Sequence, residues 1–224
     1  APNYDRYIWF ARMGEGSIGG KARGLAFLNS LIYKHLLSER YPGIKVSIPR
    51  TIVVTTDYFD QFILDNDLQY VIDSEITDEE VLSEFVSSRL PEELVEQLRV
   101  YVNTARSPLA VRSSAKLEDS SYQPFAGVYS TYMIPLVENK DQMLRMLEKA
   151  IKSVYASVFY NGSRTYIQTT ANLLSEEKMA VVIQSICGSE QNGLYYPLMS
   201  GVARSVNYYP IGNEKPEDGI VDLA

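Results

Sequence analysis

Apolar and polar positions follow one another along the chain in blocks that predict helices and strands in turn. Residues 21–37 carry apolar side chains at helical spacing directly after a glycine-rich stretch, so we expect a helix there. Residues 51–56 form a β-branched run of strand length, and Asp57 then stands where it can cap the next helix. The longest helical periodicity covers residues 141–160.

Shorter elements lie between these segments. Thr77 with Glu80 forms a capping-box pattern ahead of one helix, and Pro91 suits the first turn of the next. Strand patterns occur at residues 108–112, 128–136 and 179–184. The second of these suits an antiparallel neighbour of the first. Together these elements predict an α+β fold.

Composition narrows the classes of function. The 28 acidic and 21 basic residues give a formal charge of −7 without a clustered basic face, which argues against nucleic acid as a partner. The single cysteine, Cys187, excludes an intrachain disulfide, and one Cys with one His cannot form a zinc site, so a reducing, cytoplasmic setting is expected. We expect Cys187, which follows a buried strand, to be a small apolar filler, and His35 to be a surface or half-buried helix residue without a catalytic role.

The apolar runs of the chain bear on whether it spans a membrane, and its ends bear on whether it is part of a longer protein. No stretch of 18 or more apolar residues occurs, so no membrane span is predicted. The chain begins with Ala1 and stops at Ala224 inside what has the pattern of a strand, so we expect it to be an excised portion of a longer protein.

Residues 14–21, GEGSIGGK, place Lys21 at a helix start after four glycines. Such a loop suits phosphate, because glycines let the backbone approach an anion and a helix N-terminus offers free N–H groups. A Walker A loop does not match, since Glu15 and Ala22 occupy two of its required positions. The GxGxxG within the loop lacks a clear buried strand ahead of it. A flexible glycine loop with an exposed lysine is the alternative.

A second motif, residues 110–115 (AVRSSA), places Arg112 at the end of a buried strand. A planar guanidinium with five donors suits a polyphosphate at a strand end. The alternative is an arginine that pairs with Glu118 or Asp119 at the surface.

Further short segments can be compared with a known family together with these two motifs. They are Gly24-Leu25-Ala26, Ile48-Pro49, Val53-Val54-Thr55-Thr56, Glu118-Asp119, Phe125-Ala126-Gly127, Thr131-Tyr132, residues 179–184, residues 200–203 and residues 207–210. The set resembles the N-terminal ATP-binding domain of phosphoenolpyruvate synthases, pyruvate phosphate dikinases and rifampicin phosphotransferases. Departures at Arg50, Thr51, Pro124 and residues 204–205 indicate a divergent subgroup.

The resemblance implies an ATP-grasp-like fold with mostly antiparallel sheets. One lobe is expected in residues 1–107, with the glycine loop, and the other in residues 108–224, incomplete at its C-terminus. ATP is the implied ligand between them. Mg²⁺ is implied too, with its ligands beyond this chain, so no metal ligand is assigned here.

The resemblance also implies roles for individual residues. Lys21 and Arg112 would bind the ATP phosphates and act in catalysis, and Gly19 and Gly20 would complete the phosphate loop. Three more residues would line the nucleotide pocket: Ser113, Thr131 and, at the hinge near adenine, Gln184.

The implied activity is that of a phosphotransferase. Full-length protein would convert ATP, pyruvate and water to phosphoenolpyruvate, AMP and phosphate through a phosphohistidine on another domain. A homodimer is one assembly that the full-length protein could form. A different small acceptor and a non-catalytic ATP-sensing module are the alternatives. The isolated chain is expected to fold but to turn over negligible ATP, because phosphoryl transfer needs metal ligands that it lacks.

Overall fold

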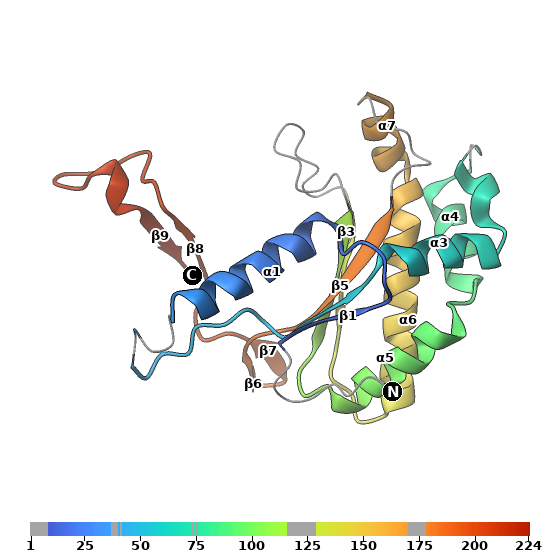
Figure 1. Ribbon diagram of the computed structural model, residues 1–224, viewed down its shortest axis with the longest axis horizontal. Coiled ribbons are helices and arrows are strands. Elements are labelled where there is room, and N and C mark those ends of the chain that lie inside the picture. The colour runs from blue at the N-terminus through green and yellow to red at the C-terminus, as the bar shows by residue number, and fades with distance from the viewer. Residues whose placement is uncertain are drawn as a thin grey trace. The chain divides into compact units, whose positions relative to one another are not determined.

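The computed structural model describes residues 9–36, 40, 42–72, 74, 76–115, 129–169 and 178–224. The chain divides into two units, Ala1–Ile186 and Cys187–Ala224. The first unit contains a five-stranded mixed sheet, and the second contains two small hairpins (Figure 1). The expected mixture of α and β structure is therefore confirmed, whereas the ATP-grasp character and the lobe boundary near residue 107 stay predictions.

The strand order of the large sheet is β1-β2-β5-β3-β4. These strands are β1 (Phe10–Met13), β2 (Thr51–Val54), β5 (Met179–Ser185), β3 (Leu109–Ala115) and β4 (Thr131–Ile134). β1 pairs with β2 in parallel and the other three pairings are antiparallel. The predicted antiparallel pairing of residues 108–112 with their downstream neighbour is confirmed.

A strand does precede the glycine loop, but it is an edge strand in which only Met13 is buried. β1 is only four residues long and directly continues into the loop, and α1 (Gly19–Lys34) then leads back to the parallel partner β2. Its FARM sequence ends in a charge and a methionine, so it does not show the apolar run expected of a buried strand.

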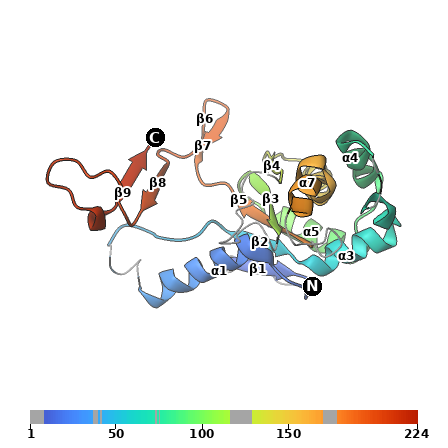
Figure 2. The ribbon, with the colours of Figure 1, turned by 90° about the horizontal axis from the view of Figure 1, so that it is seen from above.

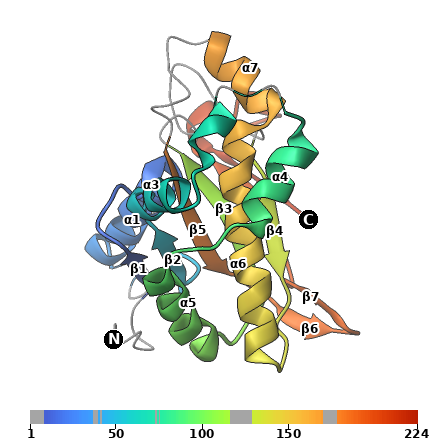
Figure 3. The ribbon, with the colours of Figure 1, turned by 90° about the vertical axis from the view of Figure 1, so that its right-hand side faces the viewer.

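Helices cover both faces of the sheet. One face carries α3 (Thr56–Asp65), α4 (Asp78–Ser87), α5 (Glu92–Thr104) and α6 (Lys140–Ala156), with the short η1 (Leu68–Ile72), η2 (Ser157–Phe159) and α7 (Asn161–Thr169) nearby. Figure 3 shows α4, α5 and α6 in front of the strands. α1 lies against the opposite face, so the strands run between it and the other helices (Figure 2).

The two faces differ in the size of their apolar cores. The face toward α3–α6 belongs to a large cluster in which Phe62 contacts Phe85 and Tyr155 at ring-centroid distances of 5.6 and 5.5 Å. The face toward α1 contributes a small cluster whose buried members are Ala22, Val53, Ala180 and Val182. Most of the apolar burial that stabilises the unit therefore lies on the first face.

Local signals set the ends of these helices. The capping box predicted at Thr77 is confirmed, because its hydroxyl accepts from Glu80 N and the Glu80 carboxylate accepts from Thr77 N. The cap predicted at Asp57 is wrong: α3 begins at Thr56 with Thr55 as its N-cap, and Asp57 lies in the first turn. The β-branched run ends as strand at Val54, two residues earlier than its pattern suggests.

The second unit is described by itself. It holds the hairpin β6 (Ser189–Gln191) with β7 (Leu194–Tyr196) and the hairpin β8 (Gly201–Arg204) with β9 (Ile220–Leu223), the latter joined through η4 (Pro216–Asp218). Asn207 is buried and bonds Glu214. Cys187, at the start of this unit, is exposed, so the expectation that it fills a gap among apolar side chains is wrong.

In the part of the chain that the structure describes, no helix has the length and apolar character needed to cross a bilayer.

Candidate functional site

The glycine loop between β1 and α1 is held by the residues that follow β2. Thr55 N donates to Met13 O at 3.0 Å, and Thr56 N donates to Ser17 O at 3.0 Å. The Thr56 hydroxyl accepts from Ser17 N at 3.0 Å. The two chain segments after the parallel strands are thus bonded to each other along their length, which fixes the path of the loop toward α1.

Asp57 completes this contact with its side chain. One carboxylate oxygen accepts from Glu15 N at 2.9 Å and the other from the Thr55 hydroxyl. Burial disfavours the charged form, but these hydrogen bonds and those from the backbone N–H groups of Gly16 and Asp57 outweigh it, so the pKa of Asp57 is lowered. A carboxylate at this helix start is further favoured by the helix dipole.

The loop needs its glycines because the residues after β2 that hold it, Thr55 to Asp57, lie very close to it. We call this set of contacts the clamp. A Cβ on Gly16 would lie 2.7 Å from Asp57 N, closer than side-chain carbons approach other atoms. Gly14 has φ +93°, a conformation that costs other residues free energy. The loop is therefore an ordered part of the fold, which argues against the alternative of a flexible glycine loop.

The start of α1 rests on strand β3. Gly19 has φ +73°, and a Cβ there would lie 1.7 Å from Ser114 O. The Ser114 hydroxyl donates to Ile18 O at 2.8 Å and accepts from Ala22 N at 3.0 Å. Only glycine at position 19 lets the first turn of the helix approach the strand this closely.

Lys21 points from this first turn to the same strand. Its Nζ donates to Ser113 O at 2.8 Å and lies 3.5 Å from the Ser113 hydroxyl oxygen. The lysine is half-buried, and Ser113 is buried. The ammonium group is thereby held beside the residue that follows Arg112 in the strand.

Arg112 lies on the α1 side of the sheet. Its Nη1 donates to Gln184 Oε1 at 3.3 Å, and Gln184 Nε2 donates to the Thr51 hydroxyl at 3.1 Å. Arg112 is half-buried, while Gln184 is buried. The amide of Gln184, on β5, thus links Arg112 of β3 to Thr51 of β2.

Strand register places Thr131 in the same row as Arg112. The two residues are paired between β3 and β4, and Arg112 is also paired with Val182 of β5. Directly paired residues point to the same face of a sheet. Thr131 is exposed, so the α1 side of the sheet is open along β4.

The predicted site residues therefore gather around one place in the first unit. Gly19, Gly20 and Lys21 begin the helix that rests on β3, and Arg112 and Ser113 belong to that strand. Gln184 and Thr131 flank it on either side. Glu118 and Asp119, the alternative partners of Arg112, lie outside the described residues, as do Phe125, Ala126 and Gly127.

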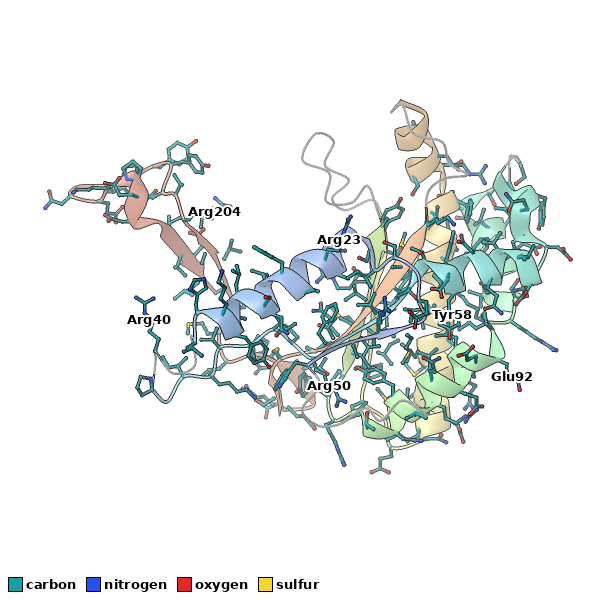
Figure 4. The ribbon with its side chains drawn as sticks, in the orientation of Figure 1. Arg23, Arg40, Arg50, Tyr58, Glu92 and Arg204 are labelled. Atoms are coloured by element: carbon teal, nitrogen blue, oxygen red, sulfur yellow. The ribbon has the colours of Figure 1, made fainter. Side chains whose placement is uncertain are left out.

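Sequence reasoning missed three contributors to this site. Ser114 and Asp57 organise the loop and helix start, and Arg23 lies on the exposed side of the first turns of α1 (Figure 4). Arg23 Nε donates to Gly19 O at 3.2 Å, so its guanidinium is folded back toward the glycines. The sequence does show Arg23 as a second basic residue close to the glycines. Helical periodicity, however, places a residue two positions after Lys21 on a different face of the helix from Lys21.

A cavity of about 300 Å³ lies at the other end of α1. Lys45 Nζ stacks 4.1 Å from the centroid of the Trp9 ring there. The 16 residues of α1 span roughly 24 Å at 1.5 Å per residue. This cavity is thus separate from the Lys21 region. The lining residues are Trp9, Asn29, Ile32, Tyr33, Leu36, Lys45, Val46 and Ser47.

Comparison with known proteins decides the family. Residues 15–223 match the family model described as pyruvate phosphate dikinase, AMP/ATP-binding domain. The chain belongs to this family. The uncharacterized phosphotransferase YvkC of Bacillus subtilis (strain 168) is 29% identical to it over 149 residues, which cover 66% of this chain and 17% of YvkC. The match thus spans less than a fifth of that relative's length.

Membership in the pyruvate phosphate dikinase family confirms the resemblance and makes ATP the expected ligand of this domain. It places the domain among those of phosphotransferase enzymes. The Mg²⁺ that the family implies finds no set of ligands here: within the described ranges, no three His, Cys, Asp or Glu side chains gather as a metal ion would require.

Proposed function

We propose that this dikinase-family domain binds ATP on the α1 side of its sheet, with the triphosphate between the start of α1 and strand β3. The observation that carries the proposal is the contact of Lys21 with Ser113, which holds an ammonium group next to the strand position of Arg112. Two cations from separate elements thereby face one region. The positive end of the α1 dipole adds to their attraction for phosphate.

Each residue then has a distinct task. Gly19 and Gly20 let phosphate oxygens approach the backbone, and Lys21 contributes a point charge. Arg112 provides a planar pair of donors for two oxygens at once. Gln184 holds Arg112 in place and lies on the same face as Thr131, so both polar side chains line the approach to the phosphates.

This arrangement suits phosphoryl transfer because the protein's part in that reaction is mainly positioning and charge stabilisation. We further propose that the intact protein passes one phosphoryl group of ATP to a histidine on another domain, while water takes up the other and AMP and phosphate leave. Pyruvate would then be the acceptor and phosphoenolpyruvate the product. The residues that select the acceptor would belong to domains other than this one.

ATP titration of the intact protein by calorimetry tests the proposal. Lys21→Ala should raise the Kd for ATP by about 10- to 100-fold, because a hydrogen bond to a charged group contributes roughly 1.5–3 kcal/mol. Lys34→Ala is the matched control, since this lysine lies exposed in the last turn of the same helix. Equal ATP affinity in both variants would refute the phosphate role of Lys21.

A further inference from the structure

The first turn of α1 is bonded to strand β3 by one buried hydroxyl. In an α-helix that begins at Gly19, Ile18 O and Ala22 N form the first pair of bonded backbone groups. The Ser114 hydroxyl contacts both members, donating to Ile18 O at 2.8 Å and accepting from Ala22 N at 3.0 Å. Among the described residues, the N-cap residue Ile18 makes no side-chain cap hydrogen bond. The hydroxyl that bonds this helix end is instead that of Ser114 on strand β3.

Ser114 is fully buried in close-fitting surroundings. Its exposed fraction is 0%, and a Cβ on Gly19 would lie 2.6 Å from the Ser114 hydroxyl oxygen. A buried hydroxyl without partners would destabilise the fold, whereas here both its donor and its acceptor capacity are used. The contact thus combines close packing with two hydrogen bonds.

Two successive residues of β3 therefore fix the start of α1. Ser113 O binds the Lys21 ammonium group, and Ser114 binds the backbone on either side of that lysine. Arg112 precedes both in the same strand. The separation of the two cations is consequently set by the contact of a helix turn with a strand and does not depend on long, flexible side chains alone.

We propose that Ser114 is a positioning residue of the ATP site: its hydroxyl sets the place of Lys21 relative to Arg112 without itself touching phosphate. The proposal rests on the proposed ATP-binding function. Without the hydroxyl, Ala22 N and Ile18 O can still pair within the helix, so the fold is retained. What is lost is the attachment of that turn to β3, and with it the alignment of Lys21.

A double-mutant cycle in the intact protein tests this role, with ATP Kd measured by calorimetry. Ser114→Ala should raise the Kd about tenfold in the wild-type background. In the Lys21→Ala background, the same change should alter the Kd less than about twofold, because residues that act through one another show non-additive effects. Ser157→Ala is the matched control: its hydroxyl is also fully buried and bonds a backbone carbonyl, Val154 O, but it belongs to η2.

Several outcomes overturn the proposal. Unchanged ATP affinity in Ser114→Ala, or an equal loss in both backgrounds, refutes a positioning role while ATP binding by the wild type still stands. A wild-type protein that binds no ATP refutes the proposed function itself, and the two failures are thus distinct. If Ser114→Ala does not fold, Ser114→Cys keeps a weak donor in a slightly larger side chain and should show the same loss of affinity.

Discussion

Two neighbouring rows of residues in the large sheet show how its faces differ. In one row, Ile52, Ile183 and Val111 are paired side by side, and all three are buried against the helices α3–α6. The next row along the strands points to α1 and contains Val182 and Arg112. A step of one residue thus leads from the large apolar core to a half-buried guanidinium, as the period of two in a strand requires.

The difference arises from how much of each face is covered. α1 buries the part of its face formed by β2 and β5, through Ala22, and its first turn covers Ser114 of β3. Toward β3 and β4 the same face holds Arg112 and the exposed Thr131. One face therefore supplies stability, while the open part of the other keeps polar groups available for a ligand. Changes on the two faces should consequently affect different measurements.

The largest effect on stability is expected from the core row. Ile183→Ala should lower the free energy of unfolding by about 2–5 kcal/mol, because it removes a fully buried side chain and leaves a cavity. The Tm should fall by roughly 10 °C. ATP affinity, measured well below the Tm, should stay within about twofold. Leu64→Ala, at an exposed position of α3, is the control and should leave the Tm nearly unchanged.

A large loss of ATP affinity in Ile183→Ala at a temperature where the protein is folded would contradict the separation of roles between the faces. Circular dichroism at the titration temperature verifies that the variant is folded.

On the α1 side, Arg112→Ala should lower ATP-dependent activity of the intact protein by about 100- to 1000-fold. The Tm should change little, because a half-buried arginine contributes little to the apolar core. Arg112→Lys should restore little activity, since an ammonium group cannot bind two oxygens in the bidentate manner of a guanidinium. Turnover and Tm are measured on the same two variants.

The alternative for Arg112 predicts the opposite pattern. If this residue serves only to pair with Glu118 or Asp119, its loss would cost about 0–1 kcal/mol of stability, lysine would substitute, and activity would survive both changes. Near-wild-type turnover in Arg112→Ala would therefore remove the main support for its phosphate role.

Sequence patterns predicted the elements with strong local signals. The capping box at Thr77 was identified because both of its bonds lie within four residues. β1 was missed because a four-residue strand has too little periodicity, and its pairing partner β2 lies about 40 residues later in the chain. Residues at the candidate site could be predicted where they belong to a short sequence motif, as Lys21 and Arg112 do.

Contacts between distant segments were not predictable. Asp57 has the pattern of a helix cap, yet its carboxylate bonds Glu15 N, 42 residues earlier in the chain. Ser114 appears as one hydroxyl in a polar strand end, and only the docking of α1 gives both of its hydrogen bonds a partner. Such roles depend on tertiary structure that local spacing does not encode.

The smallest effect concerns pH and the clamp between Asp57 and the glycine loop. The pKa of Asp57 is lowered below its ordinary value of 3.8, so the carboxylate stabilises the fold when charged. That contribution is fully present above about pH 5 and is lost as the pH falls through the lowered pKa. Asp57→Asn should therefore reduce the free energy of unfolding most near pH 7, and the difference from wild type should shrink toward pH 2.

Urea unfolding at pH 7, 5 and 3 measures this slope, with the exposed Glu138→Gln as control. A difference that stays constant from pH 7 to 3 would show that the clamp acts through shape alone and not through the charge of Asp57.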